Sequence, residues 1–258
     1  MTMKAIRLSH LMRATVIGIA VGACILAACQ RDGNGVNKEA AQQVGFYETY
    51  QLGEIAEALT ALSNEAAKHI ATSDSMNLEQ LLNTRNKTLP VWTAKGNGFA
   101  QTPVVGFALT SDTSLVNLII ARFGEKFLPK DLKLAWVFKP FKPNKYYKKP
   151  EIFELIALKA SDTLGVPSMG GTTIISAVPD VDENSGHAVM LKFDESGKQQ
   201  LAQLSKENLK RNIAFVVKDK VFCFPMVQSE ITGGQVQLTG NFTEEEVTDF
   251  VNFLYGKQ

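Results

Sequence analysis

The chain has 258 residues, of which 45% are hydrophobic and 21% charged, and its formal net charge is +1. This composition fits one or two globular units with a hydrophobic core and excludes a disordered or collagen-like chain. The first 28 residues hold three basic residues and no acid, which leaves 24 basic against 26 acidic residues in the rest. Capture of nucleic acid needs a sustained basic surface, so we expect no nucleic-acid partner.

The amino terminus has the pattern of an export signal. A stretch with three basic residues leads into the apolar run 14–28, which is short for a membrane-spanning helix and typical of a signal peptide. The run ends in Leu26-Ala27-Ala28-Cys29, which resembles the lipobox of bacterial lipoproteins. This resemblance implies removal of residues 1–28 and lipid attachment at Cys29, so that the membrane is a partner through the lipid. An ordinary secretory signal or a short membrane anchor is the alternative.

Residues 29–45 are rich in Gly, Asn and Gln and have no helical or strand periodicity. We expect them to form a solvated tether. If Cys24 leaves with the signal and Cys29 carries lipid, Cys223 is the one thiol that remains. The mature fold is then expected to have no disulfide and to depend on its core alone.

The region 46–138 is predicted to mix helices and strands. Apolar residues recur at steps of three and four through 52–70, which places them on one stripe of a helix. A short helix near 78–82 and a strand at 104–109 follow, and Asp112 is placed to cap the next helix. Alternation of apolar and polar residues predicts a strand at 132–138.

Three prolines in the segment 139–150 exclude a regular strand or helix there. The segment is the basic cluster of the chain, interleaved with Phe141, Tyr146 and Tyr147. Contact with acidic lipid headgroups or with a peptide is one interpretation. A solvated hairpin tip, with lysine heads reaching water, is the interpretation we favour.

Beyond residue 150, short strands and helices succeed one another. Lys218-Asp219 is typical of a tight turn, and Thr243 to Glu246 is a capping box at the start of a helix. Strands are predicted at 152–158, 174–178, 187–193, 213–217, 221–224 and 235–238, and helices at 197–209 and 243–254. Because strict β-α-β alternation is absent, we predict an α+β fold with mainly antiparallel sheets and packed helices.

Residues suited to catalysis or metal binding are few. His69 and His187 stand in no C-x-x-C or H-x-x-x-H pattern, so we expect no metal and no cofactor. Cys223 lies in an apolar strand, where a small core residue is a simpler interpretation than a nucleophile. The acids at 180–183 do not follow EF-hand spacing, and we interpret them as a solvated turn.

The order of motifs in the carboxyl half resembles a known family. Four segments resemble the first periplasmic domain of SecD and of fused SecDF, the protein-export factors: NLKRNIAFVV at 208–217, VFCFP at 221–225, EITGG at 230–234 and LTGNFTEEE at 238–246. The segment FYETY at 46–50 with the helix after it, and residues 106–116, resemble the preceding part of that domain. The resemblance covers nearly all of residues 46–256.

The resemblance implies a base that is split in sequence, at 46–160 with 235–258, and an inserted head at 161–234. In the family the head is thought to contact preproteins leaving the translocon, and membrane helices power its movement with the proton gradient. We find no counterpart of those helices in this sequence. We therefore expect the passive half of that cycle, an apolar surface that holds extended polypeptide or docks on a Sec-type envelope protein.

The leading hypothesis is a non-enzymatic, lipid-anchored, periplasm-facing module of the bacterial cell envelope, with inner and outer membrane both open. Its candidate polypeptide contacts are Phe222, Phe224, Pro225 and Met226, since an apolar cluster that ends in proline at a strand edge can remain exposed. Burial of these residues in the core is the alternative. A small-molecule-binding or hydrolytic lipoprotein with a cleft between base and head is the second hypothesis, and a purely architectural envelope protein is the third.

Overall fold

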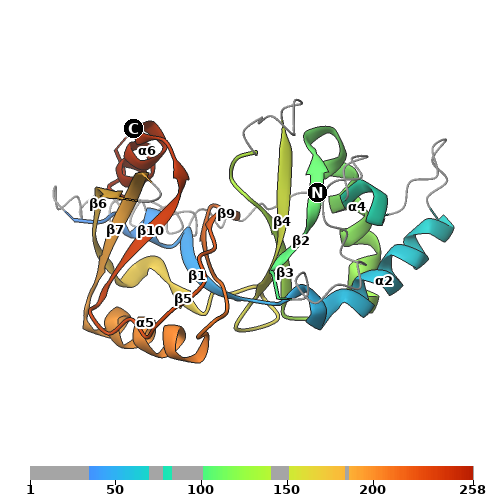
Figure 1. Ribbon diagram of the computed structural model, residues 1–258, viewed down its shortest axis with the longest axis horizontal. Helices are drawn as coiled ribbons and strands as arrows, with labels where there is room; N and C mark the ends of the chain where they lie inside the picture. The colour runs from blue at the N-terminus through green and yellow to red at the C-terminus, as the bar shows by residue number, and fades with distance from the viewer. Residues whose placement is uncertain (1–34, 70–77, 83–100, 141–150, 184–185, 258) are drawn as a thin grey trace, which may run out of the picture. The chain divides into compact units, whose positions relative to one another are not determined.

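We determined the fold from a computed structural model of the chain, which describes residues 35–69, 78–82, 101–140, 151–183 and 186–257. The elements below all lie in the compact unit 36–258 (Figure 1). The predicted signal, the lipid site at Cys29 and residues 141–150 of the basic segment lie outside the described residues. Over the described ranges, no helix combines the length and the apolar character that a membrane span requires.

Helices and strands alternate irregularly along the unit. The helices are α1 (Lys38–Ala41), α2 (Leu52–His69), α3 (Leu78–Leu82), α4 (Thr110–Phe127), α5 (Glu195–Glu207) and α6 (Glu244–Leu254), with a 3-10 turn η1 (Gly171–Thr173). The strands are β1 (Val44–Thr49), β2 (Val104–Leu109), β3 (Leu132–Trp136), β4 (Ile152–Lys159), β5 (Met169–Gly170), β6 (Ile174–Asp182), β7 (Gly186–Phe193), β8 (Ile213–Val217), β9 (Lys220–Cys223) and β10 (Gln235–Phe242).

These strands form two antiparallel sheets. Sheet A has the order β2-β4-β1-β8-β9, with β3 paired to β4 and β5 paired to β1, and sheet B has the order β10-β7-β6. Each pairing between named strands is antiparallel. The predicted α+β class with mainly antiparallel sheets is confirmed.

Sheet A closes on itself into a small ring of strands. Val137, directly after β3, forms a parallel bridge with Val221 of β9, and the amide of Phe138 donates to the Val221 carbonyl at 2.9 Å. The circuit β3-β4-β1-β8-β9 is thereby complete. Side chains inside it form one cluster that includes three alanines, which suit a narrow interior: Tyr47, Ala135, Ile156, Leu158, Ala160, Ala214, Val216 and Val221.

Helices α2, α3 and α4 pack on the outside of the ring, beside β2, β3 and β4 (Figure 1). Their contact surface is an aliphatic cluster with one buried tryptophan: Leu52, Ile55, Leu59, Leu62, Ala66, Leu78, Leu81, Leu82, Val105, Ala108, Val116, Ile119, Trp136, Leu155 and Ala157. The spacing of three and four residues in α2 and α4 produces this stripe, as predicted.

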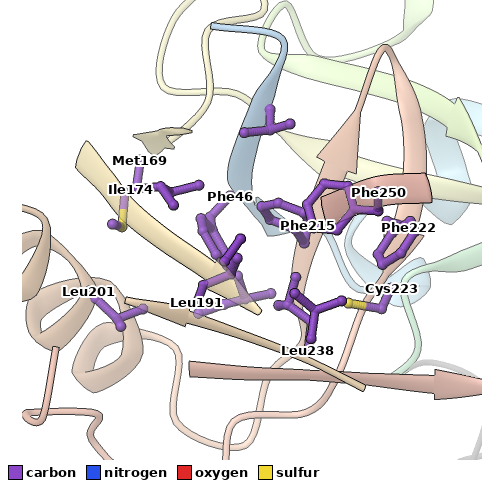
Figure 2. Close-up of a cluster of buried hydrophobic side chains, with 14 of the residues drawn as sticks. Phe46, Met169, Ile174, Leu191, Leu201, Phe215, Phe222, Cys223, Leu238 and Phe250 are labelled. Atoms are coloured by element: carbon purple, nitrogen blue, oxygen red, sulfur yellow. The ribbon is translucent and has the colours of Figure 1, made fainter. Parts of the chain in front are cut away.

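An aromatic cluster packs on another part of the outer face of the ring, between sheet A, sheet B, α5 and α6 (Figure 2). Phe215 is 1% exposed and contacts Phe46, Phe222 and Phe250 at ring-centroid distances of 4.7, 6.3 and 5.6 Å. Phe222 stacks on Phe242 at 4.5 Å. Such pairs stabilise a core beyond the area that they bury.

Several predictions about local structure were wrong. Residues 36–44 belong to the folded unit and not to a tether, because Ala40 and Ala41 are buried and Asn37 caps α1. Asp112 lies inside the first turn of α4, whose cap position is occupied by Leu109. The strand β6 extends through Asp182, so two of the acids at 180–183 lie in a sheet.

The predicted split between base and head also needs correction. Strand β10 pairs with β7 along most of its length, and α6 contributes Val247, Phe250 and Leu254 to the aromatic cluster. Residues 235–258 therefore pack mainly with 161–234, and they also contact 46–160 at Phe138 and Lys139. The reason is that a strand is assigned by its partner, and the sequence alone does not identify the partner of β10.

Candidate functional site

A groove of about 400 Å³ lies where the closing bridge of sheet A meets sheet B. One wall is β10 at residues 239–242, the other is the end of β9 with residues 224–225, and residues 137–140 with Glu154 complete the lining. Most of these side chains are apolar or aromatic. Extended polypeptide and small apolar ligands both suit such a surface.

Three of the four predicted contact residues line this groove: Phe222, Phe224 and Pro225. Phe222 is 8% exposed and belongs to the aromatic cluster, so this residue is buried in the core, as the alternative interpretation expected. Phe224 is half-buried and Pro225 is exposed. Met226 is 46% exposed but lies outside the lining. Of the four predicted contacts, Phe224 and Pro225 are therefore the ones that line the groove and keep exposed surface.

Lys139 holds two walls of the groove together. Its Nζ lies 2.5 Å from Oε2 of Glu246 in α6 and also contacts the carbonyl of Asn241 in β10. It lies over the rings of Phe138 and Phe242, at 5.1 and 5.4 Å from their centroids. Since Glu246 closes the capping box with Thr243, the start of α6 is tied to the segment after β3.

Glu154 is the acidic residue of the groove. It shares the inner side of β4 with Ile156 and Leu158, lies opposite Phe107 of β2, and its carbonyl accepts from the amide of Val137. Its side chain therefore lies at the mouth of the ring. Burial raises the pKa of Glu154 to about 7, and no described residue forms a hydrogen bond or ion pair with its carboxyl group.

Glu154 was not predicted as a groove residue, although the sequence holds a signal for it. It is the single charged residue between Ile152 and Lys159, and strand alternation sets it on the same side as Ile152 and Ile156. Burial of a carboxylate in such an apolar strand costs free energy unless a hydrogen-bond or ionic partner offsets it. The aromatic lining residues Phe138 and Phe242 come from distant segments, and no local pattern joins them.

The outer edge of β6 is blocked against further pairing. The amide of Ala177 donates to the Tyr255 hydroxyl at 3.3 Å, and the amide of Val181 donates to Oδ1 of Asp180 at 2.9 Å. Pro179, between them, has no amide hydrogen. Alternation puts all three positions on the outer edge, so this edge offers few donors to another strand.

The outer edge of β10 is open by comparison, and it borders the groove. The amide of Phe193 donates to the Gly234 carbonyl at 3.0 Å. Along an antiparallel pair, the backbone groups of every second residue point toward the partner strand. Counted from Gly234, the amides of Gln237 and Thr239 therefore point away from β7. Within the described ranges, these two amides have no hydrogen-bond partner. An extended chain in the groove can therefore pair with β10.

The remaining candidates for chemistry lie apart from one another. Cys223 is buried, and burial raises the pKa of its thiol to about 12, so it is neither a ready thiolate nor a nucleophile at neutral pH. His69 stacks on Phe123 at 5.6 Å, and His187 is exposed on β7. The described residues contain no group of three or more His, Cys, Asp or Glu that could hold a metal ion.

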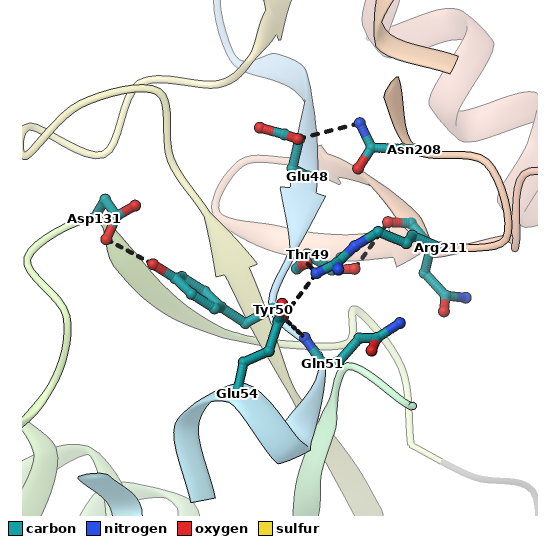
Figure 3. Close-up of polar contacts among 9 residues, drawn as sticks. Glu48, Thr49, Tyr50, Gln51, Glu54, Asp131, Asn208 and Arg211 are labelled. Atoms are coloured by element: carbon teal, nitrogen blue, oxygen red, sulfur yellow. Dashed lines mark hydrogen bonds and ion pairs between the residues drawn. The ribbon is translucent and has the colours of Figure 1, made fainter. Parts of the chain in front are cut away.

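A polar network joins the start of α2 to the loop before β8 (Figure 3). Arg211 donates to Oε2 of Glu54 at 2.7 Å and to the carbonyl of Thr49 at 3.1 Å. The Asn208 side chain donates to Glu48 at 3.2 Å, and the Tyr50 hydroxyl donates to Asp131. The network fixes β1 between the aliphatic and aromatic clusters. It reaches the groove lining through Asn212, which accepts from the Thr49 hydroxyl and donates to the Phe224 carbonyl at 2.7 Å.

Comparison with known proteins gives a match in the carboxyl half. The family described as SecDF, P1 head subdomain, matches residues 157–256. The chain is 33% identical over 87 residues to the protein translocase subunit SecD of Syntrophobacter fumaroxidans and 36% identical over 66 residues to that of Calditerrivibrio nitroreducens. These segments are 33% and 26% of this chain, and they span 16% and 13% of the two relatives.

One solved structure that is similar to the chain is described as the membrane component SecDF that enhances protein export. It is 18% identical, and the match covers 83% of this chain and 94% of that one with a TM-score of 0.34. The family match extends past residue 234, where the predicted head ends. Residues 157–256 therefore match the family of the SecDF P1 head subdomain, which confirms the expected resemblance to the SecD/SecDF periplasmic domain.

Proposed function

We propose that this chain is a non-enzymatic module of the bacterial cell envelope that binds extended polypeptide in the groove between β9 and β10. The observation that carries the proposal is the open edge of β10 at Thr239, which borders an aromatic groove inside the P1 head match. The relatives are translocase subunits, and an export component handles unfolded chains. A Sec-type envelope protein with an exposed strand would suit the same edge.

Strand addition explains how such a site would accept many sequences. Backbone hydrogen bonds to Gln237 and Thr239 depend little on the sequence of the bound chain, whereas alternate side chains of that chain would enter the apolar lining. Phe224 and Pro225 would contact these side chains from the opposite wall. The blocked edge of β6 directs pairing to β10.

The test is the binding of a fluorescein-labelled, unstructured apolar peptide to the full chain, followed by anisotropy. We expect saturable binding that Thr239→Pro weakens by roughly tenfold, since it removes an outward amide, while Thr239→Ala keeps the amide and the affinity. Thermal unfolding of both variants verifies that they are folded. Absence of saturable binding, or equal affinity of a folded Thr239→Pro variant, would overturn the proposal.

Lipid attachment at Cys29 would hold this module on the membrane, facing the periplasm. Growth with an alkyne analogue of palmitate should label the chain in its native host. Cys29→Ser should abolish the label and release the protein from membranes, whereas Cys24→Ser should leave both unchanged. Labelling that persists in Cys29→Ser would exclude this anchor.

A small-molecule-binding or hydrolytic role has one observation in its favour, the Glu154 carboxyl in the groove with its pKa at about 7. A general acid or base benefits from such a value. This role predicts that a panel of chromogenic esters and glycosides contains a substrate whose turnover is lost in Glu154→Gln. Turnover that Glu154→Gln leaves unchanged, or no turnover by the folded chain, would exclude it.

A further inference from the structure

We infer that the groove selects extended apolar segments that carry a lysine or arginine, whose cationic head pairs with the Glu154 carboxylate. This inference rests on the proposed function, because it names the class of polypeptide that the same groove would take.

The first step is the location of the carboxyl group. Glu154 lines the groove together with Val137 and Phe224, both of which belong to the cluster at the ring interior. A carboxyl group at the end of an apolar ring has lost much of its water, and an ionised group there gains from any cation that enters. A lysine or arginine stem can cross apolar lining and bring its charge to such a point.

The second step is that the described residues supply no free cation to Glu154. Lys139 is the basic residue of the described lining, and it is already bound to Glu246 and to the Asn241 carbonyl. The other groups that face Glu154 from β2, β3, β9 and β10 are apolar or uncharged, and the Cys223 thiol stays protonated because burial raises its pKa to about 12. Among the described residues the Glu154 carboxylate thus has no countercharge, and a basic ligand would provide one.

The third step is a coupling between binding and protonation. Burial raises the pKa of Glu154 to about 7 in the free groove, and an adjacent cation lowers it again. Binding of a basic segment then releases a proton near neutral pH, so its affinity should rise with pH. An uncharged segment of the same shape should show no such rise, because it favours the protonated carboxyl.

The experiment uses the full chain and two labelled peptides, identical except for a central lysine or norleucine. From about pH 6 to about pH 8 we expect the affinity for the lysine peptide to rise by roughly tenfold and that for the norleucine peptide to stay level or fall. Glu154→Gln should remove both the rise and the preference for lysine. Glu125→Gln, which changes an exposed acid on α4, is the matched control and should behave like the wild type.

The outcomes distinguish the preference for a basic segment from polypeptide binding itself. Equal affinities for the two peptides, or a lysine preference that survives in folded Glu154→Gln, would overturn this inference and leave the proposed function standing. Failure of both peptides to bind the wild-type chain would overturn the proposed function itself. An arginine peptide that behaves like the lysine peptide would support a charge pair over a lysine-specific pocket.

Discussion

The aliphatic cluster and the aromatic cluster both pack on the outer face of one ring of strands, at different places, and they are built differently. The aliphatic cluster takes its residues mainly from α2, α3, α4 and the strands beneath them, and its buried members are almost all Leu, Ile, Val and Ala. The aromatic cluster joins two sheets through six buried phenylalanines and draws its residues from much of the chain. Helical packing in the aliphatic cluster thus follows local periodicity, whereas the region that matches the P1 head family depends on long-range contacts.

Strand β1 shows why the two halves are not separable at a point in the sequence. It pairs with β4 on one side and with β8 on the other, and it supplies Phe46 to the aromatic cluster. The family match begins at residue 157, more than a hundred residues after β1. The matched region is therefore completed by a strand from outside it.

Removal of β1 should produce the largest effect. We expect a fragment of residues 157–256 to lack a cooperative unfolding transition, because β8 loses one of its two partner strands and Phe215 loses Phe46. A fragment of residues 36–258 should unfold cooperatively. Urea titrations followed by circular dichroism compare the two, and a sharp transition in the short fragment would mean that the matched region is independent of β1.

Truncation of one side chain in each cluster tests whether the clusters unfold together. Phe215→Ala should cost about 3–5 kcal/mol and Leu59→Ala about 2–5 kcal/mol of unfolding free energy, since both side chains are 1% exposed. Both variants should keep a single transition by fluorescence and by circular dichroism. Two separate transitions in either variant would show that the shared strands do not couple the clusters.

The pH dependence of stability distinguishes the groove from the rest of the molecule. Burial raises the pKa of Glu154 in the folded protein from 4.5 to about 7. The contribution of Glu154 to the unfolding free energy is therefore fully present below the ordinary pKa and is lost as pH rises to about 7. The loss amounts to at most about 3 kcal/mol. Glu154→Gln should remove this loss and be the more stable protein at about pH 8. Glu125→Gln serves again as the control, and an unchanged profile in Glu154→Gln would contradict the assignment.

The polar network should have the smallest effect of the four. Arg211→Ala breaks the contacts with Glu54 and Thr49, and because the Arg211 and Glu54 side chains are 32% and 42% exposed, we expect a loss of about 1 kcal/mol. Burial raises the pKa of Glu54, but the Arg211 hydrogen bond and other contacts lower it overall. The stabilisation is therefore present above the ordinary pKa and lost as pH falls through the folded value. A double-mutant cycle of Arg211→Ala with Glu54→Gln measures the coupling energy between the two side chains. Additive effects of the two substitutions would contradict a stabilising ion pair.

Sequence patterns predicted the helical half well because periodicity is local. The buried residues Leu52, Ile55, Leu59 and Leu62 of α2 were identified by spacing alone, and the Lys218-Asp219 turn is confirmed by positive φ angles of 48° and 63°. The helix predicted at 197–209 is shorter in the structure, because α5 ends at Glu207 and Leu209 beyond it is 46% exposed.

The groove was only partly predictable. Phe224 and Pro225 were identified from an apolar strand that ends in proline. Glu154, Phe138 and Phe242 were not, because they meet only after Val137 bridges Val221 and closes the ring. The pairing of β10 with β7, which leaves Thr239 at an open edge, is likewise a long-range event without a local signal.

The most direct test of polypeptide binding places a benzophenone side chain at Thr239 and, in a second variant of the full chain, at Glu125. Both are illuminated with the lysine peptide. The account predicts a crosslink from position 239 that unlabelled peptide competes away, and none from position 125. Equal crosslinking at both positions, or none at 239 in a folded variant, would contradict it.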